Sequence, residues 1–466
     1  MKRPLIVAFV ISIACTASPV SKPRVPAISN DDAAITNEID RFADSVIRSV
    51  PVAGLSIVVT RGSRTVLSRG YGLADVITKR PMTDSTSSRI GSITKTFTAI
   101  AIMQLIERGK IDLDAPLTRY LPEIAAPTVT VRQALNHTSG LPDNEETAIE
   151  QWLTQGKPIT NESIIGVVRD KPARPAGQSW NYNSTGFHLL GQVIEKVSGI
   201  PYHEFVRREI LKPAGLTATF MEQERQAHNI VTENYYLRDN VFIHDSIWDL
   251  PGISSAGGMF ASAADLGKIL SQLAKGRVLS ARSVAQMTTP TMLPSGARAD
   301  YGLGVRLGSL DGHPKWGHTG SARSVRAAAA YYPQDSITVV ALMNTENEDI
   351  PVSAIEIEGR VARIVLSAPS RRRTDLRLDP ERSAAYTGVY ADANVESLIA
   401  YQNGVLLFSR VGSSNPPIQL LYQGGEEWAD PEYAEFRFRF QKQESKAIAL
   451  ARYDNGWFVG LRERTR

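Results

Sequence analysis

The chain has 466 residues, of which 42% are hydrophobic and 21% are charged, as in ordinary soluble globular proteins and unlike disordered ones. This length predicts roughly two or three structural units. The formal net charge is only +4, and no basic stripe is interleaved with aromatic residues, so the composition gives no reason to expect nucleic acid as a partner.

The N-terminus carries the pattern of an export signal: two basic residues, an apolar run over 5–14, and small residues after it. We predict a signal peptide over 1–17, a leader over 18–34, and a periplasmic or secreted protein. The alternative is a buried N-terminal helix. Cys15, the single cysteine, is an alternative lipidation site. Lipidation is the one route by which we expect a membrane contact, because no later apolar run reaches 18 residues.

The next part of the chain alternates between strand and helix patterns. Apolar residues recur at helical spacing in four segments, 35–50, 92–108, 266–276 and 352–366. Strand patterns occupy 54–72, with a turn near Gly62, and 326–344. Because strands lie near both ends, we predict an α/β domain over 35–366. Its antiparallel sheet is built from the two chain ends, is flanked by helices, and has a helical subdomain inserted between them.

A polar, proline-containing segment over 367–381 is predicted to be a linker. After it the pattern becomes strictly alternating, as in "FRFRF" over 436–440, and Asn455-Gly456 is a strong hairpin signal. Residues 382–466 are therefore predicted to form a small all-β domain, either a barrel or a curved sheet.

Ser92 and Lys95 stand three residues apart at the start of the apolar segment 92–108, so they share one face of a helix. A serine hydroxyl becomes a good nucleophile when a base takes its proton. A buried lysine can be that base, since burial disfavours the charged amine. The alternative is a polar helix start, with Ser92 as a cap and Lys95 in solvent.

Two further strings change the balance between these readings: "WNYNSTGFHLLGQVIEKVSG" (180–199), with Tyr182 in a loop before a helix, and "GHTGSARS" (317–324), ahead of the late strands. With the Ser92–Lys95 pair, they resemble the serine β-lactamase and penicillin-binding protein superfamily. The branch most similar holds class C β-lactamases, D,D-peptidases and esterases. The resemblance covers about 36–366, and the C-terminal domain is only loosely similar to appendages of some members.

The resemblance implies that Ser92 is the acylated nucleophile and that Lys95 and Tyr182 act together as base and acid. Which of the two accepts the first proton stays open. A phenol has an ordinary pKa near 10, so a tyrosine base needs a cation beside it. The backbone N–H groups of Ser92 and Ser321 would form the oxyanion hole.

The resemblance also implies that Ser184, His318, Thr319 and Gly320 bind substrate. The chain departs from the family at two of these positions. The tyrosine loop ends in Ser184 where the family has asparagine, and His318 replaces a lysine, so a fixed positive charge is lost. Either arginine at 323 or 326 could restore a cation, but exposure to solvent is the simpler expectation.

Other candidate motifs favour structural readings. We expect His137, in "NHTSGLPD", to shape a loop at the edge of the site, and Gly257-Gly258 to form a backbone turn near it. The histidines do not form a tight metal-ligand motif, so we expect no metal and no cofactor.

These observations predict an exported serine hydrolase that cleaves an amide or ester bond through an acyl-enzyme on Ser92. Because of His318, peptide-like or ester substrates are favoured over β-lactams. The alternative is an inactive penicillin-binding-like protein that acts as an envelope peptide sensor or scaffold. Small molecules or peptides are the expected partners, and the oligomeric state stays open.

Overall fold

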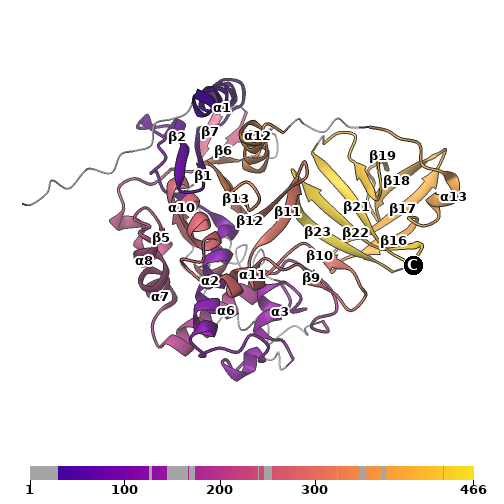
Figure 1. Cartoon of the computed structure of the whole chain (residues 1–466), viewed down its shortest axis with the longest axis horizontal. Helices are drawn as coiled ribbons and strands as arrows, with labels where there is room; N and C mark the ends of the chain where they lie inside the picture. The colour runs from indigo at the N-terminus through magenta and orange to yellow at the C-terminus, as the bar shows by residue number, and fades with distance from the viewer. Residues whose placement is uncertain are drawn as a thin grey trace, which may run out of the picture.

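The computed structural model describes residues 30–124, 128–143, 166, 174–239, 241–245, 254–322, 324–346, 352–368, 374–433 and 435–465. The predicted signal peptide lies outside these residues. The described chain forms an α/β unit followed by a β-barrel (Figure 1). The predicted fold class is therefore confirmed, and of the two C-terminal alternatives the barrel is the one observed. No helix in the described ranges is long and apolar enough to cross a membrane.

The helices lie close to their predicted segments, with starts that differ by a few residues. The first begins at Asn30, inside the segment expected to be a leader. The helices are α1 (Asn30–Ser49), α2 (Thr94–Glu107), α3 (Val131–Leu135), α6 (Ser184–Ser198), α7 (Tyr202–Val206), α8 (Lys212–Ala214), α9 (Ser254–Gly257), α10 (Ala263–Ala274), α11 (Ala281–Met287), α12 (Ala354–Leu366) and α13 (Pro380–Ser383).

The strands of the α/β unit are β1 (Gly54–Arg61), β2 (Arg64–Asp75), β3 (Arg80–Pro81), β4 (Ser88–Arg89), β5 (Phe220–Met221), β6 (Tyr235–Arg238), β7 (Val241–His244), β8 (Met259–Ala261), β9 (Thr291–Met292), β10 (Arg298–Ala299), β11 (Arg306–Leu310), β12 (His313–Ala322), β13 (Val325–Tyr332), β14 (Ile337–Met343) and β15 (Thr345–Glu346). The main sheet has the order β11-β12-β13-β14-β1-β2-β3. As predicted, the two chain ends meet in it, since β1 pairs antiparallel with β14 and Leu55 lies opposite Met343.

This sheet is buried on both faces. Alternate residues of a strand point to opposite sides, and along β14 Val340 and Leu342 belong to one apolar core, whereas Val339 and Ala341 belong to another. The first core lies against α2, α6 and α10, and the second lies against α1 and α12. The sheet is therefore the middle layer of three, which explains why β13 and β14 are apolar without alternation.

The barrel strands are β16 (Gly388–Ala391), β17 (Glu396–Gln402), β18 (Val405–Arg410), β19 (Ile418–Gly424), β20 (Glu427–Ala429), β21 (Phe436–Gln443), β22 (Lys446–Asp454) and β23 (Trp457–Arg464). Each pairs with the next, and β16 also pairs with β23, which closes the barrel. Aromatic side chains such as Trp428 and Phe440 fill its interior. The residues just before it also pack on it, because the N–H of Leu376 donates to Tyr422 O at 2.9 Å.

The barrel and the main sheet are joined by a backbone contact between β23 and β11, where Gly308 lies opposite Trp457. A Cβ on Gly308 would lie 1.9 Å from Gly456 O, so only glycine allows this approach. Beside it, Lys315 Nζ donates to Glu358 at 2.8 Å and to Asn455 O at 2.8 Å, with both charged side chains fully buried. The strand contact and the hydrogen bond from Lys315 to Asn455 O thus hold the barrel against the α/β unit, while the ion pair itself lies within the α/β unit.

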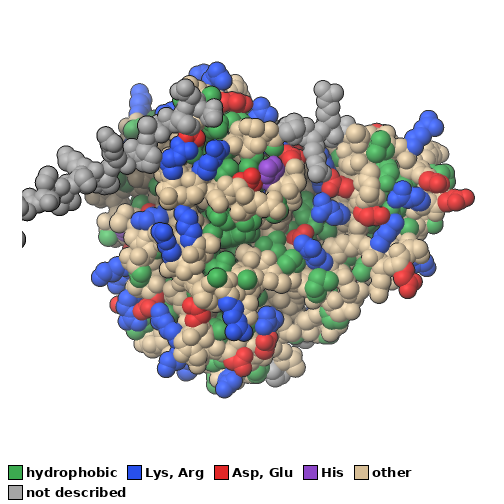
Figure 2. Space-filling view, in the orientation of Figure 1, with side chains coloured by type: hydrophobic (Ala, Val, Ile, Leu, Met, Phe, Trp, Pro, Cys, Tyr) green, Lys and Arg blue, Asp and Glu red, His purple; other side chains and the backbone are tan. Residues whose placement is uncertain are grey.

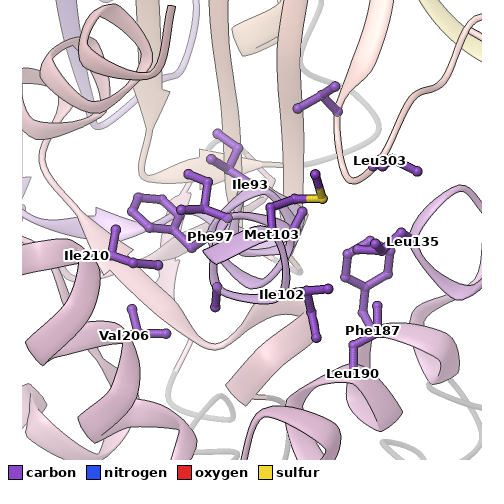
Figure 3. Packing of buried hydrophobic residues seen from close by; sticks show 14 of the residues in the cluster. Ile93, Phe97, Ile102, Met103, Leu135, Phe187, Leu190, Val206, Ile210 and Leu303 are labelled. Atoms are coloured by element: carbon purple, nitrogen blue, oxygen red, sulfur yellow. The ribbon is translucent and has the colours of Figure 1, made fainter. Parts of the chain in front are cut away.

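On the face shown in Figure 2, basic and acidic side chains are interspersed over both units. Figure 3 shows the buried environment of α2, whose apolar side chains are enclosed by other elements. Phe97 lies toward Ile210 on one side, and Ile102 lies near Phe187 on the other. A helix that is apolar on all sides is a buried helix rather than a surface helix. Lys95 lies on α2 and is therefore buried with it, with 1% of its surface exposed.

Candidate active site

Ser92 lies in a short 3-10 turn, Gly91–Ile93, and α2 begins after it at Thr94. The prediction of a helix starting at Ser92 was therefore wrong by two residues, although Ser92 and Lys95 still face each other. Lys95 Nζ donates to Ser92 Oγ at 3.1 Å. Ser92 is partly exposed, whereas Lys95 is buried, so the hydroxyl can meet a substrate while the amine is kept from solvent.

Lys95 has two more acceptors, each from a different element. Its Nζ donates to Ser184 Oγ at 3.2 Å, from the first residue of α6, and to Ala256 O at 3.0 Å, from α9. Three acceptors match the three N–H donors of an ammonium group. The solvated-lysine alternative is thereby excluded. We expected Ser184 to bind substrate, and in the structure its hydroxyl is engaged by Lys95.

Tyr182 stands beside this network, as the resemblance implied. Lys95 Nζ lies 5.0 Å from the centroid of the Tyr182 ring, a distance at which a cation is attracted to an aromatic face. The hydroxyl oxygen of Tyr182 is buried and has no hydrogen-bond partner among the described residues. No described group therefore occupies the Tyr182 hydroxyl.

The asparagine of the tyrosine loop has a structural task in this chain. Asn183 caps α6, since its Oδ1 accepts from Gly186 N at 2.7 Å, and its Nδ2 donates to Leu141 O at 2.9 Å. The N–H of Asn183 donates to His137 Nδ1 at 3.1 Å. His137, which has a φ of 65° and is buried, thus holds the tyrosine loop. This matches the structural reading of His137.

The strand β12 passes directly beside the nucleophile. A Cβ on Gly320 would lie 1.9 Å from Ile90 O, and a Cβ on Gly91 would lie 2.9 Å from Ser321 N. Both glycines are therefore required for the two backbones to approach, and Gly91 also has a φ of 48°. This contact brings the backbone of Ser321 next to the turn that carries Ser92, where the predicted oxyanion hole needs it. Thr319, which precedes Gly320 on β12, is partly exposed.

His318 is buried, and both ring nitrogens have protein partners. Nδ1 donates to Thr319 O at 2.5 Å, so Nε2 accepts from the Tyr301 hydroxyl at 2.9 Å. Burial lowers the pKa of His318 well below its ordinary value, and the positive charges of Arg306 and Lys95 act in the same direction. The imidazole is therefore neutral and linked to Tyr301, whereas we expected it to contact substrate.

The arginines after Gly320 do not supply a free cation in the described chain. Arg323 lies outside the described residues. Arg326 pairs with Glu346 and also donates to Ser321 Oγ. Its side chain has 32% exposure, so the expectation that it simply faces solvent was wrong, because Glu346 holds it against β12.

Sequence reasoning missed two residues of the site, Tyr301 and Arg306. The Tyr301 ring lies 4.5 Å from that of His137 and 6.3 Å from that of Tyr182, centroid to centroid. Burial raises the pKa of Tyr301 well above its ordinary value, so it stays a hydrogen-bond donor. A buried tyrosine in "YGLGVR" (301–306) was the available signal, but tyrosines in such segments are more often packing residues.

A serine beside a buried lysine, with a tyrosine from a second segment and a closely approaching strand, defines the class of serine–lysine hydrolases. The β-lactamase family model matches residues 39–358 of this chain, and the chain belongs to that family of serine hydrolases. This match confirms the resemblance seen in the sequence motifs. The barrel lies beyond the matched residues.

Three known proteins illustrate the relationship. The chain is 27% identical over 312 residues to penicillin-binding protein 4* of Bacillus subtilis (strain 168), covering 63% of this chain and 68% of that protein. The octameric penicillin-binding protein homologue from Pyrococcus abyssi is similar in fold, with a TM-score of 0.66, 24% identity, and coverage of 92% of this chain and 99% of that chain. A D-stereospecific amidohydrolase from Streptomyces sp. gives a TM-score of 0.58 and 30% identity, covering 66% and 94% respectively.

Proposed function

We propose that this protein is an exported amidohydrolase that cleaves amides and esters of D-configured amino acids or short peptides through an acyl-enzyme on Ser92. The observation that carries the proposal is the position of Lys95 Nζ, hydrogen-bonded to Ser92 Oγ and facing the Tyr182 ring. The likeness to the D-stereospecific amidohydrolase supports the stereochemistry.

In the first step Ser92 Oγ attacks the carbonyl carbon, and its proton passes to the oxygen of Tyr182, which enters this step as a phenolate beside Lys95 Nζ. Tyr182 is the proposed first acceptor because Lys95 Nζ already has three oxygen partners, whereas the Tyr182 oxygen has none among the described residues. The N–H groups of Ser92 and Ser321 stabilise the oxyanion. Tyr182 then returns the proton to the departing amine or alcohol as its bond to the carbonyl carbon breaks.

In the second step water attacks the ester formed with Ser92. Tyr182 takes the proton of the water, the bond between the acyl carbon and Ser92 Oγ breaks, and the serine recovers its proton. The products are the free acid and the regenerated enzyme. The same groups therefore serve both halves of the cycle, as expected for a reaction that forms and then consumes a covalent intermediate.

The neutral state of His318 supports a substrate without a carboxylate next to the scissile bond. A lysine at this position would attract such a carboxylate, whereas a neutral imidazole bonded to Tyr301 does not. Amides and simple esters therefore suit the site better than β-lactams, which carry that carboxylate.

The test combines covalent labelling with turnover. Purified protein is treated with a fluorophosphonate probe, and hydrolysis of D- and L-amino acid amides, a nitrophenyl ester and a chromogenic β-lactam is compared. We expect labelling that Ser92→Ala abolishes and D-amide turnover faster than L-amide turnover. Undiminished labelling of the Ser92→Ala variant would remove Ser92 from the mechanism. Stable ligand binding without any turnover would favour the sensor or scaffold alternative.

Export rests on the sequence of residues 1–17 and is part of the same proposal. Cell fractionation and intact mass of the mature protein distinguish cleavage after residue 17 from lipidation at Cys15. A Cys15→Ser variant that keeps its membrane association would exclude the lipoprotein form.

A further inference from the structure

Arg306, the first residue of β11, brings a positive charge to the tyrosine at the centre of the site. Its guanidinium carbon lies 5.0 Å from the centroid of the Tyr182 ring and 6.0 Å from that of Tyr301. One terminal nitrogen donates to Phe458 O at 2.5 Å. The Nε atom is buried and has no hydrogen-bond partner among the described residues. The guanidinium is therefore held by the Phe458 carbonyl and lies against the Tyr182 and Tyr301 rings.

Tyr182 thus has two cations beside it. Lys95 Nζ lies 5.0 Å from its ring centroid, the same distance as the Arg306 carbon. His318 contributes no charge, because its pKa is lowered by burial, and Arg306 is the charged neighbour that lowers it most. The second positive charge of this site therefore comes from Arg306 on β11, whereas the family pattern has a lysine at the position of His318 on β12.

The barrel contacts both Arg306 and the segment that carries Tyr182. Phe458, on β23, supplies the carbonyl that accepts from Arg306, and its ring packs against Trp180 at 4.9 Å between centroids. The N–H of Ala393, in the loop between β16 and β17, donates to Asn181 Oδ1 at 2.7 Å. Two contacts of the barrel therefore fall on the residues just before Tyr182, and a third falls on Arg306.

We propose that Arg306 is a positioning residue for Tyr182: held by the barrel, it fixes the ring and stabilises the deprotonated phenol that accepts the Ser92 proton. This inference rests on the proposed function. A positive charge beside a phenol favours its deprotonated form. Charged and titratable groups that face the Tyr182 region come from several elements, namely Lys95, Asp143, His137, Tyr301, Arg306 and His318.

The test compares Arg306→Gln, Arg306→Lys and a control, Arg119→Gln, whose parent side chain is 63% exposed and lies near Asp112. The pH dependence of Ser92 labelling by a fluorophosphonate, in which Ser92 Oγ bonds to phosphorus and fluoride leaves, is measured for each. For Arg306→Gln we expect the half-maximal point of the rise in rate to move up by about one pH unit, with about tenfold slower labelling at pH 7. Arg306→Lys restores most of this shift, and Arg119→Gln leaves the profile unchanged. A slower Arg306→Gln variant with an unshifted profile would overturn the proposal.

A second measurement separates this inference from the proposed function. The protein is labelled with fluorotyrosine, and the Tyr182 fluorine signal is assigned by its loss in Tyr182→Phe. We expect the pH at which this signal changes to rise in Arg306→Gln whether or not Ser92 is acylated. If Ser92 reacts but the signal is unaffected by Arg306→Gln, the role of Arg306 is refuted and the proposed function stands. If the signal shifts but Ser92 does not react, the proposed function fails and the contact between Arg306 and Tyr182 stands.

Discussion

A methyl group added to Gly320 tests the close approach of β12 to the nucleophile. Ordinary van der Waals contact begins at 3.4 Å, but the new Cβ would lie 1.9 Å from Ile90 O, so the two backbones must separate by about 1.5 Å. Both atoms that must move apart are held by backbone, and neither can yield by rotating a side chain. Ser321 follows Gly320 directly, and the turn that holds Ser92 begins next to Ile90. The separation therefore moves the two expected oxyanion donors away from each other.

Loss of one oxyanion donor costs about 10²- to 10³-fold in rate, and a misplacement of about 1 Å costs about 10²-fold. We therefore expect Gly320→Ala to lower kcat/KM by at least about a hundredfold, or about 2.7 kcal/mol of transition-state stabilisation. The loss of stability from overpacking should be only about 1–3 kcal/mol, so the variant should remain folded at 25 °C.

The assay is ester turnover and the rate of fluorophosphonate labelling, with thermal unfolding to show that the variant is folded. Gly186→Ala is the matched control, because its Cβ would meet its nearest neighbours at 3.4 Å inside α6. A folded Gly320→Ala variant with the turnover of the parent protein would show that Ser321 has no part in stabilising the oxyanion.

Three further changes probe the proton network, the junction and the pH dependence of stability. Ser184→Ala removes one of the three acceptors of Lys95 and should slow Ser92 acylation by about tenfold or more, measured by labelling rate. Lys315→Met leaves the Glu358 carboxylate buried without its counter-ion, with the Tyr332 hydroxyl and the Trp457 indole N–H still donating to it, and should lower the free energy of unfolding in urea by about 3–5 kcal/mol; the added change Glu358→Leu removes the buried charge and should recover part of the loss. Burial lowers the pKa of His188 from 6.5 to about 3, so between these pH values the unfolded chain binds the extra proton. The free energy of unfolding should then fall by about 1.4 kcal/mol per pH unit of acidification from this residue, and His188→Gln should flatten that slope.

The sequence predicted best those features that are set by consecutive residues, such as helices and strands. The helical spacing over 352–366 and the apolar run over 326–344 gave elements close to α12, β13 and β14 because each pattern is written in consecutive residues. The start of α2 was misplaced by two residues, since a 3-10 turn and an α-helix share nearly the same spacing. The pairing of Ser92, Lys95 and Tyr182 was found only because three separate motifs were read together. Their catalytic roles stay predictions.

By itself, the sequence determined the order and type of the elements, the α/β class, the β-rich C-terminus, and the short motifs that contain the candidate catalytic residues. The tertiary structure decided what surrounds those residues. Ala256 O and Ser184 Oγ complete the contacts of Lys95 from segments far along the chain, and Arg306 reaches Tyr182 while bonded to the barrel. Periodicity reports only which face of a segment is apolar, whereas the charge and hydrogen bonds at a site depend on which distant segments pack together.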